Sequence, residues 1–133
     1  MSLTPATLGV GMDRITLTVP SDEAFHGTLR LVIGGIGARS QLSYDEVSEL
    51  QLAVESLVAH RTLRGEAIVV EASVEGGHVS LLVGPFEPED DRAGLRVLER
   101  LVAAVSVVPR DDVQWMRLAA GRDASAPGGS PDP

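Results

Sequence analysis

The sequence predicts an α+β fold, a two-layer sandwich in which a mostly antiparallel sheet is covered on one face by three helices. Five short segments are rich in Val, Ile and Leu, which is typical of strands. Three longer segments carry apolar residues at helical spacing. The two kinds follow one another in the order β-α-α-β-β-α-β-β, and no internal repeat interrupts that order.

The first strand and the first helix are separated by a short break. Residues 15–19 alternate apolar side chains with threonine, which predicts a strand with one buried face. Pro20 ends this strand, and Ser21 can cap the helix that follows. We expect that helix to cover residues 25–36 and to be weakened at its end by Gly34, Gly35 and Gly37.

The second helix has the strongest signal in the chain. Ser43 and Glu46 form a capping-box pair at its start, and the helix is expected to run to about Thr62. Residues at helical spacing make up its apolar face: Val47, Leu50, Val54, Leu57 and Val58.

The second half of the chain predicts a hairpin, a loop, a helix and two more strands. Segments 67–74 and 79–83 are strands joined at Gly76-Gly77. The segment GPFEPEDDR (84–92) has two prolines and four acidic residues, so we expect a loop. A third helix should face inward through Leu95, Leu98, Leu101, Val102 and Val105. Two short strands, 106–108 and 113–119, end the fold, and Trp115 is expected in the core.

Length and composition predict one domain with loose ends. The chain has 133 residues, enough for a buried core, and we assign residues 13–120 to the domain. Residues 1–12 are expected to form a flexible N-terminal arm, and residues 121–133 to form a disordered tail by composition.

Composition also excludes several classes of function. The chain has no cysteine, which removes disulfides, thiolate metal sites and a cysteine nucleophile. No apolar run approaches the ~20 residues of a membrane span, and no signal peptide is recognisable, so we expect a cytoplasmic protein. The net charge of −8 disfavours binding to nucleic acid and suits a basic protein partner or simple solubility.

Four segments carry a resemblance to a known family. They are TLRLVIGGIGAR (28–39), SYDEVSELQLAVES (43–56), the strand pair and GLRVLERLVAAV (94–105). The chain resembles the RsbW-type anti-sigma factors, serine-protein kinases within the GHKL (Bergerat-fold) ATPase superfamily. The resemblance implies a GHKL-like sandwich, a homodimer, and a sigma factor or an antagonist protein as partner. Family members use ATP and Mg²⁺ to phosphorylate a serine on the antagonist.

The positions that would hold nucleotide and metal depart from the family pattern. On the second helix the family has a Glu and, four residues later, an Asn, and these positions here hold Ser56 and His60. An imidazole is a poor ligand for Mg²⁺, which prefers oxygen. The adenine-reading Asp and the following Gly correspond to Pro85 and Glu87.

The third nucleotide motif is also reduced. Of the glycine-rich lid before the last helix only Gly94 remains, beside the acidic segment EPEDD, which would repel a triphosphate. These departures from the family pattern predict vestigial nucleotide positions, no catalytic residue, no metal ligand and no cofactor, whereas the kinase alternative would require ATP and Mg²⁺. The remaining histidines are scattered and have no metal-ligand spacing.

One residue is a candidate for partner binding. Arg30 lies where the anti-sigma factors that the chain resembles carry an arginine that contacts the sigma factor or the antagonist. The alternative interpretation is that Arg30 is a solvated arginine on the helix surface. We predict a protein-binding regulator that sequesters its partner without kinase activity. The alternative is an active ATP-dependent serine-protein kinase of the anti-sigma type.

Overall fold

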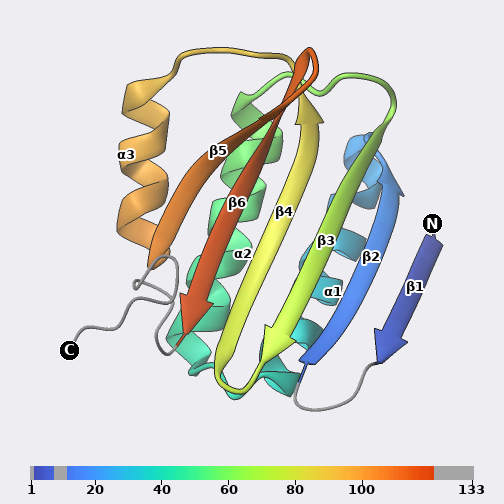
Figure 1. Cartoon of the computed structure of the whole chain (residues 1–133), viewed down its shortest axis with the longest axis vertical. Coiled ribbons are helices and arrows are strands. Elements are labelled where there is room, and N and C mark those ends of the chain that lie inside the picture. The colour runs from blue at the N-terminus through green and yellow to red at the C-terminus, as the bar shows by residue number, and fades with distance from the viewer. Residues whose placement is uncertain (1, 8–11, 122–133) are drawn as a thin grey trace.

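The computed structural model describes residues 2–7 and 12–121, with side chains from residue 14 onward, and shows a six-stranded antiparallel sheet. The strand order across the sheet is β1-β2-β3-β4-β6-β5 (Figure 1). The strands are β1 (Ser2–Thr7), β2 (Met12–Pro20), β3 (Ala67–Glu75), β4 (His78–Phe86), β5 (Ala104–Arg110) and β6 (Val113–Gly121). The α+β class, with an antiparallel sheet and three α-helices, is confirmed.

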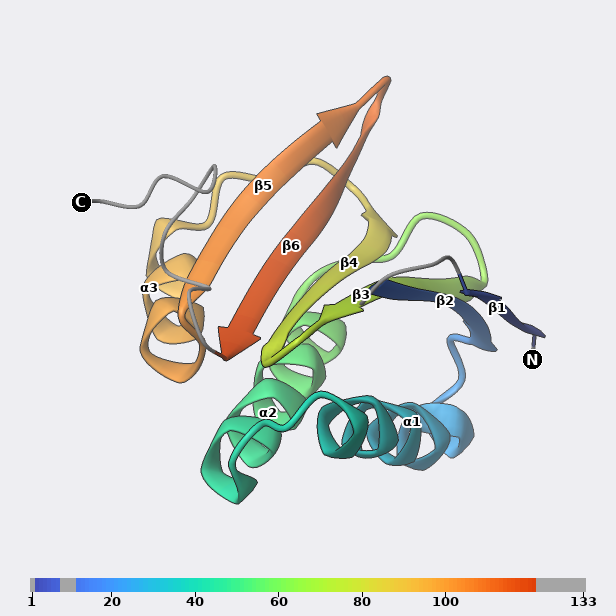
Figure 2. The ribbon, with the colours of Figure 1, turned by 60° about the horizontal axis from the view of Figure 1, so that its bottom comes forward.

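The helices all lie on one side of the sheet (Figure 2). A short 3₁₀ turn, Glu23–Phe25, leads into α1 (His26–Arg39), followed by α2 (Tyr44–His60) and, after β4, by α3 (Arg92–Leu101). Among these described helices, none combines the length and the apolar character that a bilayer crossing requires. The opposite face of the sheet carries no helix in the described part of the chain (Figures 1 and 2).

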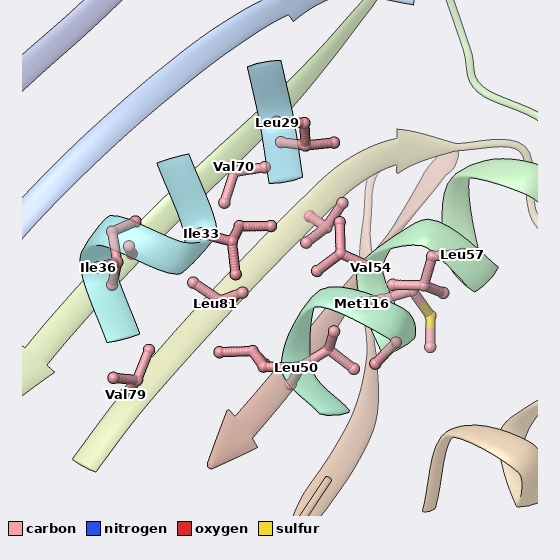
Figure 3. Packing of buried hydrophobic residues seen from close by; sticks show 14 of the residues in the cluster. Leu29, Ile33, Ile36, Leu50, Val54, Leu57, Val70, Val79, Leu81 and Met116 are labelled. Carbon is pink, nitrogen blue, oxygen red and sulfur yellow. The ribbon is translucent and has the colours of Figure 1, made fainter. Parts of the chain in front are cut away.

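The hydrophobic core lies between the helices and the covered face of the sheet (Figure 3). Of the predicted inward residues of α2, Leu50, Val54 and Leu57 are at most 2% exposed and Val58 packs against this core. Val47 is not part of it and lies next to Gly37 of α1. They meet side chains from the sheet, among them Leu81 and Met116. Alternation along each strand sends every second side chain to this core and the rest to the open face.

Helix boundaries follow local capping chemistry. Ser43 caps α2 as predicted, because its hydroxyl accepts from the Glu46 backbone N–H while the Glu46 carboxylate accepts from the Ser43 N–H. The first helical turn is capped by Asp22 and not by Ser21. α1 continues through its glycines to Arg39. Its backbone at Gly37 lies close to the side chain of Val47 on α2, which the missing Cβ allows.

The N-terminal arm prediction is wrong for residues 2–7. These residues form β1, which pairs with β2 along its whole length. A proline is compatible with this strand because β1 is at the edge of the sheet, where one side of the backbone has no neighbouring strand. The predicted disordered tail lies outside the described residues, except for Gly121, which ends β6.

Three further corrections concern the second half. β4 runs to Phe86, so Gly84 and Pro85 belong to the strand and not to the predicted loop; the Gly84–Pro85 peptide is cis. α3 ends at Leu101, and Val105 lies in β5. Trp115 is only half-buried, because it alternates with the buried Met116 and so lies on the open face.

Candidate functional site

The five positions predicted to be vestigial nucleotide positions lie on or next to three elements at one end of the molecule. Ser56 and His60 are on the last turns of α2, Pro85 and Glu87 are at and just beyond the end of β4, and Gly94 is in the first turn of α3. The end of α2 and the end of β4 lie at the same end of the fold (Figure 1). In the described chain, no hydrogen bond or ion pair joins the α2 pair to the other three positions.

The His60 ring contacts the backbone of Ser56. The His60 Nδ1 lies 3.0 Å from the Ser56 carbonyl oxygen, so the ring bonds back onto its own helix. The His60 side chain is exposed and Ser56 is half-buried. The imidazole therefore closes the last turn of α2, near the negative end of the helix dipole.

The segment after α2 pairs with the end of β4. The Arg64 N–H donates to the Pro85 carbonyl oxygen at 2.9 Å, and the Glu87 N–H donates to the Thr62 carbonyl oxygen at 2.8 Å. Leu63 and Phe86 form an isolated antiparallel bridge between these two bonds. Phe86 is fully buried. This pairing holds the backbone of Pro85 and Glu87 in place.

Arg64 organises a charged cluster at this position. Its Nε and Nη2 donate to the two carboxylate oxygens of Glu87 at 2.6 and 2.7 Å, a bidentate arrangement. Its Nη1 donates to the carboxylate of Asp112 at 3.1 Å, and Nη2 also donates to the Asp112 carbonyl oxygen. These hydrogen bonds lower the pKa of Glu87 and of Asp112 below their ordinary values and raise the pKa of Arg64.

A buried arginine lies next to this cluster. Arg61 is 7% exposed, and its Nη1 donates to the side-chain oxygen of Gln114 at 3.1 Å. The same oxygen accepts from the Glu89 backbone N–H at 3.3 Å. Gln114 thus links the end of α2 to the acidic segment that precedes α3.

Gly94 has a capping role. Its N–H donates to the Asp91 carboxylate at 2.9 Å, which makes Asp91 the N-cap of α3. A Cβ at Gly94 would lie 2.2 Å from an oxygen of that carboxylate. A side chain at this position would therefore require the capping carboxylate to shift.

Arg30 lies apart from these residues, at the contact between α1 and α2. Its guanidinium pairs with the carboxylate of Glu55, and the two side chains are 51% and 38% exposed. The Arg30 carbonyl oxygen also accepts from the Gln51 side chain at 2.9 Å. A carboxylate on a partner would have to compete with Glu55 for this guanidinium.

Sequence reasoning missed Arg61, Arg64, Asp112 and Gln114. The contacts of Arg64 span 23 and 48 residues along the chain, so no local spacing could indicate them. Glu87 was predicted only as a nucleotide-site position, without the arginine partner that the structure gives it. The described residues contain no group of three or more His, Asp or Glu that could hold a metal ion.

Comparison with known proteins gives one kind of match. No protein-family model matches the chain, and no curated protein sequence matches it. The crystal structure of the RsbU and RsbW domains of Rv1364c from Mycobacterium tuberculosis has a similar fold, with a TM-score of 0.65 and 17% identity over 81% of this chain. This chain matches 32% of the length of that one. At this identity the similarity shows an RsbW-like fold and nothing finer.

Proposed function

We propose that this chain is a regulatory protein-binding module of the anti-sigma type, which sequesters a sigma factor or its antagonist without phosphorylating either. The RsbW-like fold supports the class of regulator. The charge of −8 supports a basic surface on the partner, since opposite charges steer association over long distances.

The observation that carries the second half of the proposal is the bidentate pair between Arg64 and Glu87. Glu87 corresponds to a position at which the RsbW-type family that the sequence resembles has a glycine, which lets the adenine approach. Here its carboxylate is engaged by Arg64, while the backbone on both sides is paired with the segment after α2. A purine at this position would have to displace these contacts.

The donors at the other positions fit magnesium and triphosphate poorly. His60 bonds back to Ser56, and imidazole is a weak ligand for a hard cation. The Gly94 N–H, which a phosphate could use at a helix start, is already satisfied by a carboxylate. We therefore propose that no cofactor is used and that competition between binding proteins governs partner exchange.

Thermal melting with Mg-ATP separates this proposal from the alternative, an active ATP-dependent serine kinase. A ligand at about 100 times its dissociation constant adds about 2.7 kcal/mol to the free energy of unfolding. We expect no change in the melting temperature at millimolar Mg-ATP, and no phosphate transfer to a captured antagonist. A saturable upward shift would favour the kinase.

Partner capture tests the regulatory role and the part of Arg30. We expect the tagged chain to retain a sigma factor or an antagonist-like protein from its native host, identified by mass spectrometry. Arg30→Glu should reduce capture about tenfold if this arginine anchors the interface. Glu55→Gln is the matched control, because it removes the internal partner of Arg30 and leaves the guanidinium free to bind.

Two outcomes would contradict these statements. Capture that is equal for wild type and Arg30→Glu would remove Arg30 from the interface. Capture of no sigma factor and no antagonist-like protein would remove the regulatory role itself. Exposed ion pairs contribute little to stability, so both variants should remain folded, and a circular dichroism melt checks this.

A further inference from the structure

A hollow of about 250 Å³ lies where the start of α2, the end of α3 and the end of β6 meet. It is at the other end of α2 from Ser56 and His60, so it is separate from the predicted nucleotide positions (Figure 1). The Gly121 backbone forms part of its wall and is closely packed, because a Cβ there would lie 2.0 Å from the Gly77 carbonyl oxygen. The volume is below the range of about 300–1,000 Å³ that is typical for drug-sized ligands, so it suits a smaller molecule.

Two glutamates of α2 line this hollow. Glu46 and Glu49 are three residues apart and lie on the same face of the helix. One oxygen of the Glu46 carboxylate accepts from the Ser43 N–H at 2.8 Å, which fixes this side chain in the capping box and leaves its second oxygen without a partner in the described chain. Glu49 is exposed and likewise has no side-chain partner among the described residues. Like charges at this spacing repel each other, and a bound cation would remove that repulsion.

The end of α3 adds backbone acceptors to the hollow. The last carbonyls of an α-helix have no donor within the helix. At this end the Val102 N–H donates to the Leu98 carbonyl oxygen at 3.1 Å, whereas the Ala103 N–H donates to the Ala119 carbonyl oxygen at 3.0 Å. The carbonyls of residues 99–101 therefore have no helical donor, and they form the negative end of the helix dipole. Residues 100 and 101 line the hollow, so these acceptors add to the two carboxylates in attracting a cation.

Arg100 brings the opposite charge to the same hollow. Its side chain is exposed and forms no ion pair or hydrogen bond in the described chain, unlike Arg30 and Arg64. The two glutamates and Arg100 thus share a hollow without neutralising one another. A guanidinium in this state is suited to a ligand carboxylate, which it can bind through two parallel N–H donors.

We propose that this hollow binds a small basic amino acid, with the ligand carboxylate on Arg100 and its two amino groups on Glu46, Glu49 and the open carbonyls of α3. The charges select this class of ligand, because two carboxylates and one guanidinium are balanced by a molecule with two positive groups and one negative group. A neutral amino acid would leave one carboxylate unmatched, and an acidic side chain would be repelled by it. The inference does not depend on the proposed regulatory function, since neither Arg30 nor a protein partner takes part.

Isothermal titration calorimetry of the full chain with L-lysine tests the proposal. We expect a saturable heat with a dissociation constant of about 0.1–1 mM, since a half-open hollow buries few groups of the ligand. L-lysinamide lacks the carboxylate charge and L-norleucine lacks the side-chain ammonium, while both keep the size of lysine. Each should bind about tenfold more weakly than L-lysine, the effect of losing about one charge-assisted hydrogen bond.

Substitutions in the hollow make the test specific to this site. Arg100→Gln and Glu49→Gln should each weaken the binding of L-lysine about tenfold. Arg100→Gln should also bind L-lysine and L-lysinamide equally, because the group that distinguishes the two ligands is gone. The matched controls are Arg96→Gln and Glu99→Gln, which remove the same charges at exposed positions of α3 outside the hollow and should bind L-lysine as the wild type does.

The absence of a saturable heat at up to about 10 mM L-lysine would overturn the proposal. So would wild-type affinity in Arg100→Gln or in Glu49→Gln, or an equal loss of affinity in these variants and in their controls. Tighter binding of L-lysinamide than of L-lysine would show a site for cations alone and would overturn it too. Circular dichroism spectra of all four variants should match the wild type, because the four side chains are exposed and none has an ion-pair partner in the described chain.

Discussion

The contact between α1 and α2 and the connection from β4 to α3 are built in opposite ways. Along the helix contact, small residues let two backbones approach, and Gly37 lies so close to Val47 that a Cβ would come within 2.6 Å of a methyl carbon. Buried leucine, isoleucine and valine continue this contact into the core. Here shape and apolar area determine the geometry.

The connection from β4 to α3 depends on polar contacts between distant segments. Arg64 binds Glu87 and Asp112, and Gln114 joins Arg61 to the backbone of Glu89. Most of these groups are partly exposed, so water screens their attraction. The difference teaches that close packing determines the geometry of the helix contact, whereas the connection from β4 to α3 depends on side chains that come from distant segments.

The first prediction compares two glycines of α1. Gly37→Ala should lower the free energy of unfolding by about 1–2 kcal/mol, because overpacking against Val47 exceeds the gain in helix propensity. Gly35→Ala should raise it by about 0.5–1 kcal/mol, since Gly35 is exposed and has nothing within 4 Å of its would-be Cβ. Urea melts of both variants measure these changes.

The two substitutions are each other's control, because they add the same methyl group two positions apart in the same helix. If both stabilise the protein, α1 and α2 are less closely packed than described. If both destabilise it, the glycines serve backbone conformation and not the approach of the two helices.

Much of the fold could be predicted because it follows from local chemistry and periodicity. The Ser43 capping box and the apolar spacing of α2 placed that helix closely, although it ends at His60 and not at Thr62. The end of β4 was misplaced because Gly84 and Pro85 usually signal a turn. The strand β1 was missed because it is held by pairing with β2, and its own residues give no clear strand pattern.

The candidate site was less predictable, for a physical reason. Motif positions such as Glu87 could be found from the sequence. The contacts around them involve Arg64, Asp112 and Gln114, which come from other segments of the chain. The pairing of Arg30 with Glu55 across two helices was likewise out of reach of local spacing. Charge contacts between distant segments follow no sequence period, so sequence spacing does not indicate them.

The smallest expected effect concerns the Arg64 cluster and its dependence on pH. Arg64 lowers the pKa of Glu87 in the folded chain below its ordinary value of 4.5 through hydrogen bonds to the carboxylate. The unfolded chain therefore binds a proton at Glu87 more readily than the folded chain does. The stabilisation is present in full above the unfolded pKa and is lost as the pH falls through the folded pKa.

Glu87→Gln should therefore melt at a lower temperature than wild type at pH 7, and this difference should shrink below about pH 4.5. The effect should be small and should weaken in salt, because Glu87 and Arg64 are about 40% exposed. Melting curves of both proteins from about pH 3 to about pH 7, which spans the titration of Glu87 in the unfolded chain, measure this difference in melting temperature. Glu89→Gln is the matched control, since in the described chain Glu89 forms its hydrogen bond through the backbone N–H and not through its carboxylate. An equal, pH-independent change in both variants would show that the Arg64 pair does not hold this connection.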